Sequence, residues 1–482
     1  MIAAWFDLAR FNEPLLLVTA PLIGAALAAA VPNARASWAI AVMSAAIGAL
    51  IALDMATRGL FEGAAVGVSR HDGAGLFIAP VLGIAGLLVV LAFGALAKDV
   101  STRAAPFANA LVLASVAGWN GALFAGDLVS MFLASEVAWI AGVGLVAICG
   151  ERDRAALNGA MQMVIVGGVG AATTLLGVGL INNGLGSVEL LAFTTAQLRA
   201  PNVTALGVGL VVLGFAIKAG AAPFHAWVGA GVGRTGAGAA LALGVLASVG
   251  AVTVLIRAAG FAFAAPELGG GVAAVLGAIG AASVVFGSLQ AVGARNLKRL
   301  AAYAGIAQIG CILLSAALGS PAGLAAALVQ TFSMCAAALA LFTGAAAMGV
   351  VNVASLDGLG RRAPLASVAI SVGALSLMGA PLTIGFLGRW RMIEAGVGAG
   401  WWWAAAAVVA ASLAGVFYAG KLIDRLYFRK SSAPYIGEGG AWRWLFGPAF
   451  VVSIVAILIG LEPIVLLNAA DAAATRIMGL AP

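Results

Sequence analysis

Apolar runs of about twenty residues recur along almost the whole chain, and they restrict the possible folds more than any other feature of the sequence. A run of this length is what an α-helix needs to cross roughly 30 Å of hydrocarbon. In lipid every backbone polar group must be paired within the protein, so only helices or a closed barrel can span the membrane. Because the runs do not alternate between apolar and polar residues, they are typical of helices rather than barrel strands.

About fourteen such runs can be marked, which predicts an all-α polytopic membrane protein. Their approximate limits are 14–31, 36–53, 76–97, 106–124, 127–149, 158–182, 202–225, 235–257, 270–292, 300–318, 322–349, 364–390, 400–421 and 444–468. Only 9% of the residues are charged, against roughly 25% in a soluble chain. The polar connections are too short to form a soluble domain, so any redox or nucleotide chemistry would lie on another chain.

The distribution of basic residues predicts the orientation of the chain in the membrane. Lysine and arginine concentrate in the odd-numbered loops, most clearly in "ARNLKRLAAY", "GLGRRAP" and "GKLIDRLYFRKSS". Cytoplasmic loops of membrane proteins carry an excess of these residues. We therefore expect a multi-pass protein of the cell (inner) membrane with both termini on the outer, periplasmic side. No basic run interleaved with aromatic residues indicates a nucleic-acid partner.

The most informative residues are ionisable ones inside predicted spans, because a charge at mid-bilayer costs at least ~2.5–3.5 kcal/mol. Glu136 lies near the middle of the fifth span, Lys218 lies deep in the seventh, and Arg389 lies toward the end of the twelfth. Such residues face the bundle interior, form pairs and mark ion paths. The alternatives are a purely structural ion pair for Glu136 with Lys218, and an Arg389 side chain that reaches the membrane surface.

Two prolines interrupt the same spans that carry Lys218 and Arg389. Pro223 and Pro381 each remove a helical hydrogen bond and free carbonyl groups for water or an ion. Interrupted helices at corresponding places in two halves are the best pointer from sequence to a transport site. We therefore predict that Lys218 relays protons with Glu136 as its counter-charge. His225, beside Pro223, either shuttles protons or satisfies a backbone carbonyl.

Four segments resemble a known family. They are "GWNGALFAGDLVSMFLASEVAWIAGVGLVAICGERDRAAL", "FAIKAGAAPFHAW", "NLKRLAAYAGIAQIG" and "GLGRRAPLASVAISVGALSLMGAPLTIGFLGRW". Over roughly residues 70–395 the chain is similar to the proton-translocating membrane subunits shared by respiratory complex I, membrane-bound hydrogenases and Mrp-type cation/proton antiporters. Among these proteins, the antiporter D subunit is the one that the sequence of these segments most resembles. The resemblance implies two inverted five-helix repeats, broken seventh and twelfth helices and a central hydrophilic axis.

The resemblance also assigns roles and a division of the chain. It implies that Glu136 is the paired acid and Lys218 the relay base, and it places Arg389 where the family usually has a terminal lysine. The implied parts are N-terminal helices in 1–105, a first repeat in 106–260, a second repeat in 261–425, and a loop with a last helix in 426–482.

The sequence departs from the family pattern along the axis. Ser248 or a neighbour occupies the place of an eighth-helix lysine or histidine. Where the family has a histidine and a lysine in the eleventh helix, the polar residues are Gln330, Thr331 and Ser333. Arginine at position 389 cannot deprotonate, so it acts as a fixed charge rather than a relay.

These observations leave three functions open. The first is the proton-translocating subunit of a multisubunit cation/proton antiporter, coupled to sodium or potassium by partner membrane subunits. The second is a proton-pumping subunit of a complex I-like NADH:quinone oxidoreductase or a membrane-bound hydrogenase. The third is a non-conducting structural paralogue. The sequence indicates no cofactor and no metal, and its scattered cysteines, Cys149, Cys311 and Cys335, are expected to be small buried hydrophobic residues.

Overall fold

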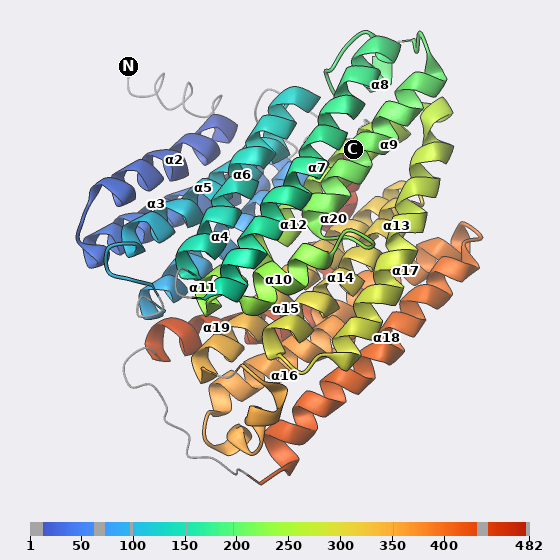
Figure 1. The fold of residues 1–482 in the computed structure, drawn as a ribbon. Coiled ribbons are helices and arrows are strands. Elements are labelled where there is room, and N and C mark those ends of the chain that lie inside the picture. Colours follow the sequence, from blue (N-terminus) through green and yellow to red (C-terminus); the bar gives the residue numbers. More distant parts are fainter. Residues whose placement is uncertain are drawn as a thin grey trace.

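The computed structural model describes residues 13–61, 73–96, 100–150, 153–195, 197–349, 351–430 and 442–478. In these ranges the chain is helical (Figure 1). The α-helices are α2 (Glu13–Ala30), α3 (Ala34–Ala56), α4 (Gly73–Ala95), α5 (Ala105–Phe124), α6 (Leu128–Cys149), α7 (Arg154–Leu185), α8 (Ala192–Thr195), α9 (Pro201–Ala219), α10 (Ala226–Arg234), α11 (Ala237–Ala242), α12 (Ser248–Phe263), α13 (Pro266–Gly293), α14 (Leu297–Ala316), α15 (Pro321–Met348), α16 (Pro364–Met378), α17 (Ile384–Gly398), α18 (Trp402–Ile423), α19 (Trp442–Leu461) and α20 (Ile464–Ile477). Shorter turns are the π-helical η1 (Thr57–Phe61), η3 (Leu243–Ala247) and η6 (Asp424–Phe428), and the 3₁₀ turns η4 (Val353–Leu356) and η5 (Leu359–Arg361).

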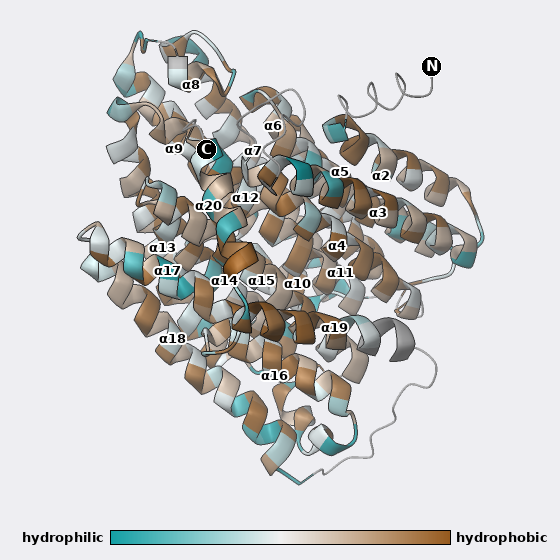
Figure 2. Ribbon diagram, turned by 180° about the vertical axis from the view of Figure 1, so that it is seen from behind, coloured by the Kyte–Doolittle hydropathy of each residue, from teal (hydrophilic) through white to brown (hydrophobic). Residues whose placement is uncertain are grey.

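The all-α polytopic fold predicted from the apolar runs is confirmed. Within the described ranges, twelve helical stretches are each long and apolar enough to cross a membrane, or up to thirteen when the bent pair α19–α20 is counted as one span. Each predicted run coincides with a helix or with a pair of helices. The estimate of fourteen is higher because the run 364–390 is divided between α16 and α17, neither of which is long enough alone. Apolar residues cover most of the helices (Figure 2).

Two of the spans are interrupted, as the sequence predicts. The seventh is divided into α9 and α10, and the twelfth into α16 and α17. In both, the first helix ends at a glycine in the left-handed conformation, Gly220 with φ of 78° and Gly379 with φ of 80°. A residue with a Cβ atom is strained there, so glycine is the usual residue at such a helix end. Pro223 and Pro381 follow shortly afterwards and prevent the helix from resuming in register.

Two isolated antiparallel bridges tie loops to helix starts. One joins Asp127, before α6, to Glu189, after α7, and the other joins Asn296, before α14, to Asn352, after α15. Both Asp127 and Asn296 also accept backbone N–H groups of the helix that follows and so cap its start. Five membrane-crossing segments separate the two helix starts, so the two bridges lie at opposite faces of the membrane.

α15 lies at the centre of the bundle, and 94% of the residues in its most apolar stretch are buried. α19 packs beside α15 and α16, and the chain then bends by 81° into α20, which packs on α15 and α4. The predicted outward placement of both termini falls on residues 1–12 and 479–482, which lie outside the described ranges. Cys311 and Cys335 are buried as expected, whereas Cys149 is partly exposed.

Candidate functional site

Lys218 and Glu136 form an ion pair inside the membrane-spanning bundle. Lys218 Nζ lies 2.7 Å from Glu136 Oε1, and the lysine side chain is fully buried while that of Glu136 is 20% exposed. The ammonium also donates a hydrogen bond to Ser135 Oγ at 2.9 Å. Phe132 and Phe215 place their rings 5.2 and 5.7 Å from Nζ. A carboxylate, a hydroxyl and two ring faces therefore replace water around this charge.

The break in the seventh span places Lys218. The residue stands in the last turn of α9, two positions before the left-handed Gly220, whose N–H and that of Ala221 return to carbonyls of the last helical turn. The negative end of a helix dipole favours a cation at this place. The indole of Trp227, on α10, donates to the Ile217 carbonyl at 3.1 Å and so holds the two halves of the broken span together.

His225 lies at the same break but turns toward another helix. It precedes α10, and its Nε2 lies 2.9 Å from Gln290 Nε2 on α13. Its ring stacks on Phe286 with the centroids 6.1 Å apart. Ser283, also on α13, accepts the N–H of Ala222 at 2.9 Å. The structure thus places His225 beside α13 rather than against the Glu136–Lys218 pair.

Arg389 occupies a second polar cluster, at the break of the twelfth span. The side chain is buried and reaches back from α17 to the end of α16, where Nη1 donates to the Met378 carbonyl and Nη2 to the Leu377 carbonyl, each at 2.6 Å. Nη1 also donates to Ser412 Oγ on α18. The carbonyls are those that the helix end leaves unpaired. Arg389 is therefore a fixed cation held by the negative end of α16 rather than by a carboxylate.

Two buried glutamines extend this cluster into the core. Gln330 on α15 donates to Gln308 Oε1 on α14, and Gln308 donates to the Leu377 carbonyl that Arg389 also reaches. The sequence analysis named Gln330 but missed Gln308. The signal for Gln308 is an amide side chain inside a predicted apolar span. Like a charge, such a group requires a partner in the core.

A small cavity separates the two clusters. It measures about 10 Å³, the space of about one water molecule, and its wall includes Ala219, next to Lys218, and Leu377, of the Arg389 cluster. Ser248 also lines it. The Ser248 hydroxyl lies 3.4 Å from the Leu243 carbonyl. Of the predicted site residues, Glu136 and Lys218 thus form one cluster and Arg389 belongs to another, while His225 lies apart from both. Ala219, Leu377 and Ser248 line the cavity between the two clusters.

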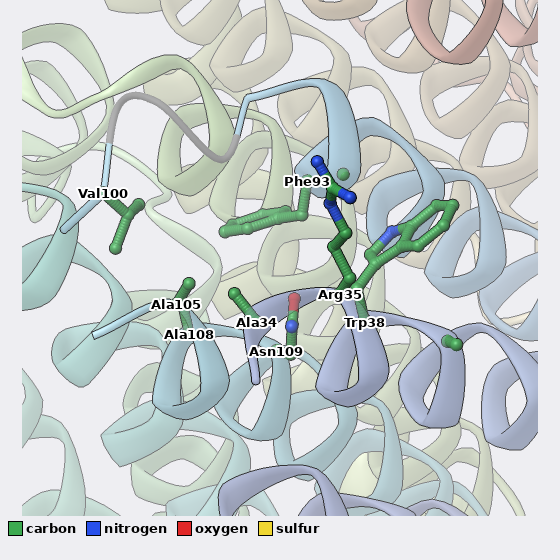
Figure 3. A pocket seen from close by; sticks show the side chains of 10 residues that line it. Ala34, Arg35, Trp38, Phe93, Val100, Ala105, Ala108 and Asn109 are labelled. Carbon is green, nitrogen blue, oxygen red and sulfur yellow. The ribbon is translucent and has the colours of Figure 1, made fainter. Parts of the chain in front are cut away.

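A larger cavity, of about 320 Å³, lies among α3, α4 and α5. Arg35, Trp38, Phe93 and Asn109 are among the residues that line it (Figure 3). Its lining includes none of the predicted site residues. Among the residues that the structure describes, no group of three or more histidine, cysteine, aspartate or glutamate side chains is placed to hold a metal ion.

Comparison with known proteins assigns the chain to a family. Residues 125–414 match the family described as "NADH:quinone oxidoreductase/Mrp antiporter, TM". NADH-quinone oxidoreductase subunit N of Desulforudis audaxviator is 30% identical, with 74% of each chain covered. Subunit N of Rhodopseudomonas palustris is 29% identical over 94% of this chain and 96% of that one.

Solved structures show the same fold. A chain of the Mrp complex from Dietzia sp. superposes with a TM-score of 0.84 at 23% identity, covering 97% of both chains. A chain of respiratory complex I from Thermus thermophilus superposes with a TM-score of 0.80 at 24% identity, covering 95% of this chain and 99% of that one. The protein therefore belongs to the membrane-spanning family shared by NADH:quinone oxidoreductases and Mrp antiporters.

Proposed function

We propose that this chain conducts protons through its membrane-spanning bundle and that Glu136 and Lys218 relay them. The observation that supports this most directly is the ion pair of 2.7 Å between a fully buried lysine and a carboxylate inside the bundle. When Glu136 takes up a proton or moves away, Lys218 loses its counter-charge and can pass its own proton on. Return of the carboxylate restores the charged amine, so the pair works as a two-state switch.

Arg389 has a different part in this proposal. Its guanidinium stays charged and contacts the carbonyls of Leu377 and Met378. A permanent positive charge beyond the cavity raises the cost of bringing a proton there, and this cost is smaller when Lys218 is neutral than when Lys218 is charged. Gln308 and Gln330 order any water in this cluster, and Ser248 stands between it and Lys218. His225 is proposed to assist proton entry from the side of α13.

We propose a redox-driven complex of the NADH:quinone oxidoreductase kind as the host. The supporting observation is that the curated relatives named above, at 29–30% identity, are subunit N of such enzymes. Other membrane subunits would then be the partners and would bring the electron-transfer chemistry. A multisubunit cation/proton antiporter is the second candidate, because the matching family includes Mrp antiporters. In that case protons would exchange for sodium or potassium.

We further propose that residues 106–260 and 261–425 are two inverted repeats, preceded by helices in 1–105 and followed by a last helix in 426–482. The two bridges support this relation. Leu128 N–H donates to the Val188 carbonyl, and at the opposite face Leu297 N–H donates to the Val351 carbonyl, each one residue after the bridged position. The left-handed glycines that end the first helix of each broken span, Gly220 and Gly379, also occupy corresponding places in the two proposed repeats.

Everted membrane vesicles carrying the complete native complex test the proposal. A pH gradient is followed in wild type and in Lys218→Ala, with NADH, another reduced donor, sodium or potassium added in turn. Lys421→Ala, which removes a lysine at the end of α18, is the matched control. A donor-driven gradient that is lost only in Lys218→Ala supports the redox pump. A cation-dependent signal with the same loss supports the antiporter. Full activity in Lys218→Ala refutes the relay.

A further inference from the structure

A second feature of the bundle is an apolar crevice of about 520 Å³ between α3, α4, α15, α19 and α20. Its wall is hydrocarbon almost throughout and includes Phe77, Ile84, Phe332, Ala336 and Val455. Ile84 and Val455 are exposed at its edge, whereas Ala336 is only 9% exposed on the central helix α15. The crevice therefore opens toward the surrounding lipid and reaches inward to the core helix. Neither Glu136 nor Lys218 lines it.

The dimensions of the crevice restrict what can occupy it. Along α4 it is lined from Leu76 to Leu88, which is ~18 Å at ~1.5 Å per residue. One leaflet of the membrane is about half of ~30 Å, so the crevice runs through about the depth of one leaflet. An apolar crevice of this length suits a hydrocarbon chain of a membrane lipid.

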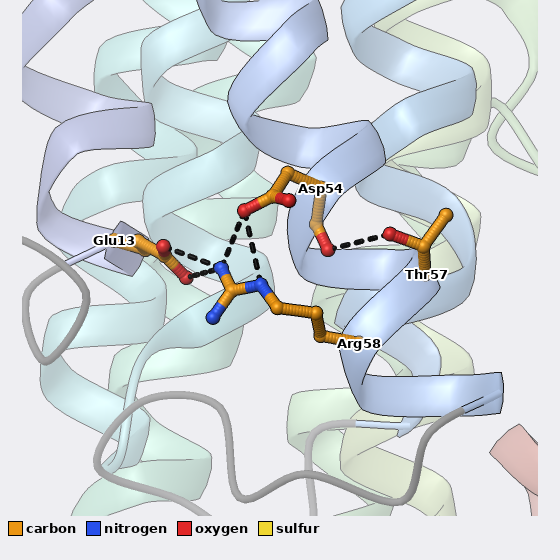
Figure 4. Close-up of polar contacts among 4 residues, drawn as sticks. All are labelled: Glu13, Asp54, Thr57 and Arg58. Carbon is orange, nitrogen blue, oxygen red and sulfur yellow. Dashed lines mark hydrogen bonds and ion pairs between the residues drawn. The ribbon is translucent and has the colours of Figure 1, made fainter.

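The polar end of the crevice carries a carboxylate. Thr57 and Glu462 line the crevice, at the ends of α3 and α19 that adjoin the start of α4. Glu462 is exposed and, in the part of the chain that the structure describes, has no ion-pair partner. Arg58, next to Thr57, is engaged by Glu13 at 2.5 Å and Asp54 at 2.6 Å (Figure 4). Arg58 is thus already paired with two carboxylates, whereas Glu462 lines the crevice.

We propose that the crevice binds the hydrocarbon chain of a membrane lipid whose headgroup carries a primary amine, with that amine beside Glu462. The chain fills an apolar groove that is one leaflet deep, and the ammonium pairs with the free carboxylate. The negative charge of Glu462 opposes headgroups with a net negative charge. The lipid wedges between α3–α4 and α19 and so joins the N-terminal helices to the C-terminal pair.

Photocrosslinking in membranes that contain the assembled complex tests the proposal. The probes are phosphatidylethanolamine and phosphatidylglycerol, each with a diazirine in one acyl chain, and labelled peptides are mapped by mass spectrometry. The ethanolamine probe is expected to label peptides of α4, α15 and α19 about fivefold more than the glycerol probe, the factor that corresponds to ~1 kcal/mol for an exposed ion pair. Glu462→Gln removes this difference, while Glu394→Gln, at an exposed carboxylate of α17, retains it.

Two variants test the groove itself. Ala336→Phe fills its inner wall and is expected to lower labelling by both probes about tenfold. Ile84→Trp narrows the exposed edge and gives the same result if the first variant does not assemble. Ala410→Phe, on the lipid-exposed face of α18, is the control and leaves labelling unchanged. Equal labelling by both lipids overturns the amine assignment. Absence of labelled crevice peptides in wild type, or crosslinks to another subunit there, overturns the lipid site.

Discussion

Lys218 and Leu377 occupy corresponding places in the two broken spans. Each stands two residues before the left-handed glycine that ends the first helix of its span, Gly220 or Gly379. In the first span the charge is on Lys218 itself and is paired with a carboxylate. In the second, Arg389 supplies the charge from beyond the break and donates to the Leu377 carbonyl. One half thus holds a group that can release a proton, and the other holds one that cannot.

Glu136→Ala is expected to abolish proton transport and leave the complex assembled. The variant leaves the buried Lys218 ammonium without its counter-charge, and removal of one partner of a buried pair costs ~3–5 kcal/mol. Lys218 can avoid this cost by staying neutral, which preserves the fold but stops the switch. Gradient formation in everted vesicles and the yield of intact complex measure both effects. Wild-type transport in this variant would exclude Glu136 as the paired acid.

Lys218→Arg is expected to be nearly as inactive as Lys218→Ala. Arginine keeps the positive charge beside Glu136 but does not release a proton at physiological pH. The comparison of the two variants in the same vesicles separates deprotonation from simple charge pairing. If arginine restored transport, Lys218 would act only as a fixed charge.

Arg389→Lys is expected to retain most transport, whereas Arg389→Leu destabilises the assembled protein. A lysine ammonium supplies donors for the carbonyls of Leu377 and Met378 and keeps the fixed charge. Leucine leaves the Met378 carbonyl without its donor, at ~1–3 kcal/mol, whereas Gln308 still donates to the Leu377 carbonyl. Thermal unfolding of the purified complex and vesicle transport provide the two readouts. An inactive but stable Arg389→Lys protein would indicate a role that needs the guanidinium itself.

Ser248→Val is expected to slow transport without a comparable loss of stability. The change replaces a hydroxyl with methyl groups in the wall of the cavity between the two clusters, so a water molecule there loses a hydrogen-bonding group. Ser248→Thr keeps the hydroxyl and is the matched control. The rate of gradient formation should fall in the valine variant and change little in the threonine variant. Equal rates in wild type and valine variant would place the proton path elsewhere.

The sequence by itself determined that this protein lies in a membrane. It also determined the helical spans, both breaks, and three of the residues that carry charge in the core. Length, apolar character, and the positions of proline and charge can be read directly along the chain, and a charge within a span is costly in lipid. Only the tertiary structure decided which of these residues meet. It paired Lys218 with Glu136, turned His225 toward Gln290, and satisfied Arg389 with carbonyls instead of an acid. These contacts depend on which faces of the helices pack together. Helices from distant parts of a chain meet only in the packed bundle.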